Sequence, residues 1–263
     1  MDVHKQCEAI SYSAEGLRPV AVNAVLETSL LLLVNGRELA TLQCTGLYPR
    51  YLAAGFLFCN GIVGQARDIG DIAVDEREDG LVARIELVSK APVAPRLSLT
   101  SGQGLAALGC GPEGAAAKRN APVCTPGQLL TLAAELEARS ELYRATRGCH
   151  NSTLCSAGEI LFFCPDIGRH NAIDTIAGKC LLEGIDTRDK ILLSTGRVSG
   201  EIALKAARCG FAVLASRSMA TSLGAELARK LGLTLVGDIT PEGCLIYHNS
   251  GSVGLTGTDR SPR

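Results

Sequence analysis

The chain has 263 residues, a hydrophobic fraction of 46% and a net charge of −1, so it can build one large domain or two modest ones. Aromatic residues make up only 4% and Trp is absent, so aliphatic side chains must supply the core. No run of Lys and Arg is present, which argues against non-specific binding of nucleic acid. The apolar runs are shorter than a membrane span, and residues 1–16 lack the apolar region of a signal peptide. We therefore expect a cytoplasmic protein that binds neither membranes nor nucleic acid.

Eleven cysteines is a high and odd number for this length, so they cannot all pair, and a reducing compartment is indicated. No two of them have the C-x-x-C spacing, which argues against a zinc ribbon or a thioredoxin-type pair. Several lie in apolar runs and are expected to be small core residues. Cys110 and Cys149 differ because glycine precedes each of them in loop-like sequence, where a thiol can be exposed and reactive.

The N-terminal part predicts a small α+β unit. Asn35-Gly36 between two strand-like runs predicts a β-hairpin over residues 30–43, because a type I′ turn needs positive φ at both central positions. Apolar periodicity then predicts a helix over residues 49–58 and strands over residues 69–74 and 81–88.

Composition divides the chain into three parts. Residues 89–95 carry two prolines and indicate a linker. Residues 99–125 are rich in Gly, Ala and Pro and indicate a mobile loop. We therefore expect an N-terminal α+β domain over residues 1–98, this loop, and a C-terminal domain over residues 126–263.

The C-terminal part alternates strand and helix patterns, which predicts an α/β fold with a sheet covered by helices. Thr125 and Pro126 suit the N-cap and first position of a helix that runs to Arg139. The later patterns predict strands around residue 154 and over residues 160–163, 190–194, 211–215, 233–236 and 245–247, with helices over residues 169–183, 199–209 and 221–231.

The segment Asp166-Ile-Gly-Arg-His-Asn-Ala-Ile-Asp174 stands between a predicted strand and a predicted helix. Such strand–glycine–helix junctions hold anionic ligands in α/β proteins. One interpretation is a phosphate or nucleotide site formed by Arg169, His170 and backbone N–H groups. The other is a capped helix whose charged side chains are solvated.

A second segment, Ser194-Thr-Gly-Arg-Val-Ser-Gly-Glu201, repeats this pattern and places Arg197 and Ser199 at a helix start. Arginine can bind phosphate through two parallel hydrogen bonds. The alternative is a helix cap with a surface arginine. Because parallel strands end at the same edge of a sheet, we expect the two segments to lie close together.

Two further turns follow later strands, over residues 216–222 and 237–243. Together the four turns predict a large phosphorylated ligand across the strand ends. In the last turn the predicted ligand contacts are Asp238, Thr240, Pro241 and Gly243. Neither a Walker A sequence nor a helix-opening G-x-G-x-x-G is present, which disfavours ATP hydrolysis and dinucleotide redox chemistry.

With these segments identified, the chain resembles the formate dehydrogenase accessory sulfurtransferase family, FdhD/NarQ, over residues 27–247. The resemblance rests on Leu33-Val-Asn-Gly36, on Ala54-Gly-Phe-Leu57, on the segment of residues 166–174, and on Gly196-Arg-Val-Ser-Gly-Glu201 with Lys205. It implies a C-terminal domain similar to cytidine deaminases and a homodimer. It also implies transfer of sulfur, as a Cys persulfide, from a cysteine desulfurase to the molybdenum or tungsten bis-guanine-dinucleotide cofactor of formate dehydrogenase.

The chain departs from the family at its cysteines, since the usual Cys-Gly-x-Cys-Gly motif is absent from the predicted loop. One alignment places Gln103 and Ala106 at the two Cys positions, and the other retains Cys110 and replaces the second Cys with Glu113. Cys110 is accordingly the predicted catalytic thiol. Cys149, beside His150, and Cys124 are the second and third candidates.

Deaminase chemistry is excluded because the chain lacks both the His/Cys-x-Glu and the Pro-Cys-x-x-Cys elements that bind the catalytic zinc, so no zinc is expected. Two function classes remain open. The first is a sulfur carrier, and the second is a non-catalytic binding module or chaperone for the cofactor or its client enzyme.

Overall fold

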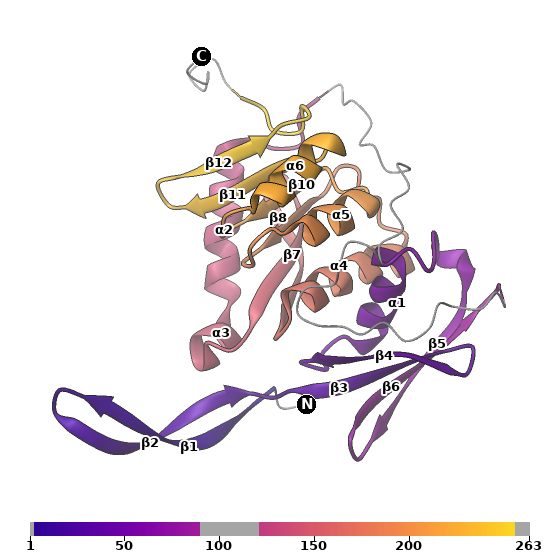
Figure 1. The fold of residues 1–263 in the computed structure, drawn as a ribbon. Coiled ribbons are helices and arrows are strands. Elements are labelled where there is room, and N and C mark those ends of the chain that lie inside the picture. The colour runs from indigo at the N-terminus through magenta and orange to yellow at the C-terminus, as the bar shows by residue number, and fades with distance from the viewer. Residues whose placement is uncertain (1–2, 90–120, 256–263) are drawn as a thin grey trace.

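The computed structural model describes residues 3–89 and 121–255. Its fold is of the predicted α/β class, with helices packed on mixed sheets (Figure 1). The strands form a two-stranded sheet of order β1-β2, a four-stranded sheet of order β4-β3-β6-β5 and a six-stranded sheet of order β12-β11-β10-β9-β7-β8. None of the helices in these ranges is long and apolar enough to cross a membrane.

The N-terminal elements are β1 (His4–Ser13), β2 (Gly16–Val25), β3 (Thr28–Val34), β4 (Arg37–Cys44), α1 (Pro49–Cys59), the short helix η1 (Ala66–Asp68), β5 (Ile69–Arg77) and β6 (Gly80–Leu87). The hairpin of β3 and β4 confirms the prediction, since Asn35 and Gly36 adopt φ angles of 48° and 75°. Helix α1 covers one face of the four-stranded sheet, where Leu30, Phe56 and Ile85 are fully buried.

Strands β1 and β2 form a long hairpin that projects from the rest of the molecule (Figure 1). The sequence analysis did not predict it. Most of its residues are exposed, including the large apolar side chains of Tyr12 and Leu17 near the tip, so no buried apolar face marks these strands in the sequence. At its base, strand β2 contacts helix α3.

The C-terminal elements are α2 (Pro126–Arg139), α3 (Glu141–Thr146), β7 (His150–Ser156), β8 (Glu159–Asp166), α4 (Arg169–Glu183), β9 (Ile191–Ser194), α5 (Gly200–Arg208), β10 (Val213–Ser216), α6 (Ser222–Lys230), β11 (Thr234–Thr240) and β12 (Gly243–His248). The predicted cap of α2 is present, because the Thr125 hydroxyl accepts a hydrogen bond from the Gln128 N–H at 3.3 Å. The short helix α3 was not predicted.

Strand β11 is longer than predicted and changes the expected last turn. It continues to Thr240, so only Pro241 and Glu242 separate it from β12. Residues 237–243, predicted as one turn, therefore form the end of β11 and a tight hairpin turn into β12. The pairing of the two strands has a register irregularity that begins at Gly237. Parallel pairing with β10 ends at Val236, and the antiparallel partner β12 extends the strand beyond that point.

Helices α1 and α4 connect the two larger sheets through an unusually close contact. A Cβ atom on Gly178 would lie 1.9 Å from the Tyr51 carbonyl oxygen, and one on Gly55 would lie 1.6 Å from that of Asp174. Only glycine permits this approach of the two backbones. The N-terminal sheet is thereby fixed against the helix that begins at the first predicted ligand segment.

The division into domains of residues 1–98 and 126–263 stays a prediction. Most of the predicted loop, residues 99–125, lies outside the described residues. Its last residues are held in place, because the Cys124 N–H donates to the Ser252 carbonyl at 3.2 Å and the Cys124 side chain is buried.

Candidate functional site

The carboxyl ends of β8, β9 and β10, which carry three of the four predicted turns, meet the start of β7 at one edge of the six-stranded sheet. Strands β9, β10 and β11 are parallel, and β7 runs antiparallel to both β8 and β9. The carboxyl ends of β8, β9 and β10 and the start of β7 therefore lie at the same edge. In open α/β sheets this edge is where ligands bind.

The two predicted ligand segments contact each other at this edge. The side chain of Arg169 crosses Gly196 so closely that a Cβ on Gly196 would lie 2.9 Å from Arg169 Cβ. His170 Nε2 lies 3.6 Å from a carboxylate oxygen of Glu201. A side chain at Gly196 would therefore prevent Arg169 from taking this position.

One turn further along, the same segments are joined by a buried ion pair. Lys205 Nζ donates to both carboxylate oxygens of Asp174 at 2.8 and 2.7 Å, and both side chains are almost fully buried. The carboxylate raises the pKa of Lys205, so the lysine remains charged inside the protein. This pair fixes α5 against α4 and positions the helix starts that carry Arg169 and Ser199.

Asp166 organises the turn before α4 and is not among the described residues that line the two cavities at this edge. Its carboxylate accepts hydrogen bonds from the Gly168 N–H at 2.9 Å, from Asn171 Nδ2 at 2.9 Å and from the Thr45 N–H at 3.1 Å. Burial raises its pKa, although these donors act in the opposite direction. Asp166 therefore ties the segment after β4 to the start of α4.

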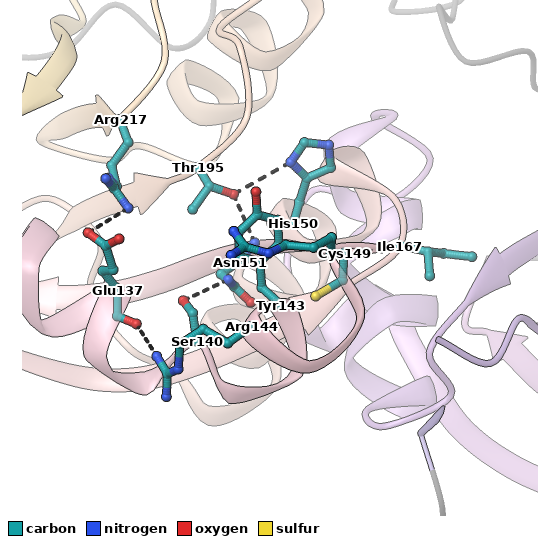
Figure 2. Close-up of a pocket in the computed structure, with 12 residues that line it drawn as sticks. Glu137, Ser140, Tyr143, Arg144, Cys149, His150, Asn151, Ile167, Thr195 and Arg217 are labelled. Carbon is teal, nitrogen blue, oxygen red and sulfur yellow. Dashed lines mark hydrogen bonds and ion pairs between the residues drawn. The ribbon is translucent and has the colours of Figure 1, made fainter. Parts of the chain in front are cut away.

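The larger of two neighbouring cavities lies at this edge and has a volume of about 730 Å³, within the range of about 300–1,000 Å³ for small-molecule sites. It is bounded by α2, α3, the start of β7 and the turns after β8, β9 and β10 (Figure 2). Its lining residues are Glu137, Ser140, Tyr143, Arg144, Arg147, Gly148, Cys149, His150, Asn151, Ile167, Thr195 and Arg217.

Three arginines give this cavity a cationic lining, but they differ in their partners. Arg217 forms an ion pair with Glu137 at 3.0 Å, and Arg144 donates to the Glu137 carbonyl at 2.7 Å (Figure 2). Arg147 lies over the ring of Tyr143, 5.2 Å from its centre, and forms no ion pair within residues 3–89 and 121–255. Its charge is therefore available to an anionic ligand.

The smaller cavity, of about 490 Å³, lies between β4 and the start of α4. Gly148, His150 and Ile167 line both cavities. Arg169 and His170 line only the smaller one, so the predicted phosphate residues of the first segment border this part of the site. Two adjoining cavities with a shared wall suit an extended ligand with more than one arm.

The histidines of the site are held in their neutral form. Burial lowers the pKa of His170 to about 3, with further contributions from the charges of Lys205, Arg169 and His150. Burial also lowers the pKa of His150, assisted by Arg169 and Arg197. At neutral pH both rings can therefore donate or accept hydrogen bonds, and the arginines supply the positive charge.

The two candidate thiols that the structure describes, Cys149 and Cys124, are poorly suited to nucleophilic attack. Cys149 lines the larger cavity, but burial and the charge of Asp166 raise its pKa to about 11. Burial raises the pKa of Cys124 to about 11 as well. The thiolate is the reactive form, so neither residue is activated by its surroundings. Cys110, the predicted catalytic thiol, lies outside the described residues.

The remaining predicted residues divide into two groups. Arg197 is exposed, forms no ion pair with the described residues and lowers the pKa of His150 by its charge. Ser199 occupies the N-cap position of α5 at the same edge, but its side chain forms no capping hydrogen bond with the described residues. Neither residue is among the described residues that line the two cavities. The Asp238 N–H donates to the Ser218 carbonyl at 3.1 Å. Among the residues that the structure describes, the linings of the two cavities do not include Thr240, Pro241 or Gly243, which form the β11–β12 turn.

Several cavity residues were missed by the sequence analysis, chiefly Ser140, Arg144, Arg147 and Asn151. The first three belong to α3 and its flanking residues, and this six-residue helix has no fully buried side chain to create an apolar period. Asn151 follows the predicted Cys149-His150 pair but carries no motif of its own. Arg217 had a signal, because it directly follows a predicted strand.

Comparison with known proteins identifies the class to which this fold and site belong. The model of the FdhD/NarQ family matches residues 25–253. The sulfur carrier protein FdhD of Listeria monocytogenes is 32% identical over 254 residues, which cover 94% of this chain and 97% of that protein. The protein of the same name from Staphylococcus aureus is 33% identical over 233 residues, with coverages of 85% and 86%. The chain therefore belongs to the FdhD/NarQ family, as its motifs predicted.

A solved structure described as a formate dehydrogenase accessory protein from Desulfotalea psychrophila has the same fold. It matches 96% of this chain and all of its own length with a TM-score of 0.77, at 22% sequence identity. The likeness to cytidine deaminases and the homodimer stay predictions.

Proposed function

We propose that this protein is a sulfur carrier in the maturation of formate dehydrogenase and that its site holds the molybdenum or tungsten bis-guanine-dinucleotide cofactor as substrate. The observation that carries the proposal is the pair of adjoining cavities at the carboxyl edge of the six-stranded sheet. They have the cationic lining that phosphate requires and together extend over two compartments, as a ligand with two nucleotide arms requires.

The charge distribution supports a phosphorylated ligand more specifically than the net charge does. The chain as a whole is nearly neutral, yet Arg144, Arg147, Arg169, Arg197 and Arg217 gather around one sheet edge. The start of α4 lies at the same edge and adds the partial positive charge of a helix N-terminus.

The sulfur step that we propose is a thiol exchange. A thiolate of this chain attacks the outer sulfur of a persulfide on a cysteine desulfurase, the S–S bond of the donor breaks, and the donor cysteine leaves as a thiolate. The chain then carries the sulfur as its own persulfide to the bound cofactor. Cys110 remains the proposed carrier, because burial raises the pKa of the described candidates Cys149 and Cys124.

The second candidate function is a binding module that holds the cofactor or its client enzyme without moving sulfur. The raised pKa values of Cys149 and Cys124 favour it, as does the absence of the family's Cys-Gly-x-Cys-Gly motif. A sulfur carrier and a module that holds the cofactor need the same cofactor site. Formation of a persulfide on a cysteine of this chain separates the two function classes.

Persulfide mapping by mass spectrometry separates the two functions. The full chain would be incubated with a cysteine desulfurase and labelled cysteine, in parallel with Cys110→Ala and with Cys244→Ala as a control at a half-buried thiol. We expect label on Cys110 in the wild type and in the control and none in Cys110→Ala. Label at another cysteine would overturn the assignment of Cys110, and a wild type without any persulfide would favour the binding module.

A further inference from the structure

Asn151 contains a buried acceptor whose partner is missing from the described protein. The residue is 1% exposed, and its side-chain oxygen Oδ1 has no hydrogen-bond partner within residues 3–89 and 121–255. A buried amide oxygen left without a donor costs about 1–3 kcal/mol. Since Asn151 lines the larger cavity, the missing donor is expected to come from what that cavity binds.

The orientation of the amide is fixed by its other end. Asn151 Nδ2 donates to Ser140 Oγ at 2.8 Å (Figure 2). The Ser140 hydroxyl donates in turn to the Leu136 carbonyl at 2.7 Å. Because the serine proton is committed to Leu136, Ser140 can only accept from Asn151. The amide nitrogen therefore points to Ser140, and the oxygen is the atom left for a ligand.

The backbone of Asn151 is held equally firmly. Its N–H donates to Thr195 Oγ1 at 3.0 Å, and its carbonyl accepts from the Thr195 N–H at 2.9 Å. These bonds connect the start of β7 to the turn after β9. The acceptor is thus preorganised, as a recognition group must be if it is to discriminate between ligands.

We propose that Asn151 Oδ1 reads the N–H edge of a guanine base bound in the larger cavity. This inference rests on the proposed function, because it assigns a base-reading residue to the proposed nucleotide site. Guanine presents two adjacent donors, N1–H and the 2-amino group, and one oxygen with two lone pairs can accept from both. Adenine presents a donor beside an acceptor. Because the Asn151 amide nitrogen is bound to Ser140, Asn151 can accept from the adenine donor but cannot donate to the adenine acceptor.

The surroundings of Asn151 fit a nucleotide. Tyr143 and Arg147 form a stacked pair in the cavity lining, and aromatic rings and guanidinium planes are surfaces on which bases stack. Arg147 also supplies a positive charge for a phosphate group at the same cavity. The base edge and the phosphate therefore have separate partners, which allows the two interactions to be measured independently.

Calorimetric titrations with GDP, ADP and inorganic pyrophosphate test the proposal on the full chain. We expect the wild type to prefer GDP to ADP. In Asn151→Ala the affinity for GDP should fall about 5- to 100-fold, because the donors of the guanine base lose their buried acceptor. The affinity for pyrophosphate should stay unchanged. Asn151→Asp keeps the acceptor and should retain the preference for GDP. Ser140→Ala should weaken that preference, because the Asn151 amide loses the hydrogen bond that fixes its orientation. The control is Gln6→Ala, which removes an exposed side-chain amide of β1.

The outcomes separate this inference from the proposed function. A wild type that binds neither GDP nor pyrophosphate would overturn both. If the wild type binds GDP and Asn151→Ala retains its affinity and selectivity, only the role of Asn151 is refuted. Equal losses of GDP and pyrophosphate binding, or failure of both Asn151 variants to fold, would show that the residue serves the structure of the site and not base recognition.

Discussion

Helices α4 and α5 each present two different environments within two turns. At their starts, Arg169 lines the smaller cavity and Ser199 lies at the same sheet edge. One turn later, Asp174 and Lys205 form an ion pair that is sealed from solvent and packed beside α1. A single strand–turn–helix segment therefore combines a binding end with a structural end, and its polar residues do not all serve the ligand.

The difference follows from what burial does to charge. An exposed arginine such as Arg197 keeps its hydration and can exchange it for an anion. Asp174 and Lys205 have lost their hydration and depend on each other, so the pair specifies how α4 and α5 meet. Substitutions at the structural end should thus affect folding, whereas substitutions at the binding end should affect ligand affinity alone.

The largest effect is expected from Asp174→Ala, which leaves the Lys205 charge buried without its partner. We expect a loss of about 3–5 kcal/mol in the free energy of unfolding, measured by urea denaturation. The double variant Asp174→Leu with Lys205→Met removes both charges and should recover most of this loss. A single variant as stable as the wild type would show that the pair is not structural.

The helix contact should be nearly as sensitive. In Gly178→Ala the new methyl group would lie 1.9 Å from the Tyr51 carbonyl oxygen, so the backbones of α1 and α4 must separate. We expect a loss of at least about 1–3 kcal/mol, the range typical of overpacked sites. Gly158→Ala is the matched control, since a methyl group there meets no atom within 4 Å. Equal stabilities of the two variants would contradict the proposed contact.

The binding end should respond in the opposite way. In Arg197→Ala we expect GDP affinity to fall about tenfold or more, because one charge-assisted contact is lost, while the free energy of unfolding stays within about 0.5 kcal/mol. The control is Arg188→Ala, because Arg188 precedes β9 whereas Arg197 follows it. Calorimetry and urea denaturation of both variants give the two quantities. A loss of stability without a loss of affinity would move Arg197 to the structural group.

Most of the sheet and its edge could be predicted from sequence because their signals are local. Predicted strands and helices matched β7 to β12 and α4 to α6 within a few residues, and the glycine turns correctly predicted that the ligand segments meet at one edge. The Asn35-Gly36 hairpin was equally explicit, since its turn type depends on two adjacent residues.

The missed parts depend on contacts between distant residues. No local pattern shows that the Asn151 amide is bound to Ser140 or that Arg169 lies against Gly196, since these pairs form only when the elements pack. The division of each segment into a binding and a structural end was hidden for the same reason. Arg169 and Asp174 are both polar residues of one motif, and only burial distinguishes them.

The smallest expected effect concerns His170, at the boundary between the two ends of α4. Burial lowers its folded-state pKa to about 3, against an ordinary value of 6.5, so only the unfolded chain takes up a proton between these values. Stability should therefore decrease as the pH falls below 6.5, by about 1 kcal/mol between pH 7 and pH 5.5 from this group. The lowered pKa values of His150 and His248 act in the same direction, so the wild-type slope alone does not isolate His170.

His170→Gln isolates it, because glutamine keeps a polar side chain of similar reach but does not titrate in this range. Urea denaturation at pH 7.0 and pH 5.5 should give a smaller pH-dependent loss for this variant than for the wild type, by about 1 kcal/mol. If the two proteins lose stability in parallel, His170 is not held neutral by burial. It would then belong with the arginines at the binding end, as a cation available to phosphate, and the boundary within α4 would lie one turn closer to Asp174.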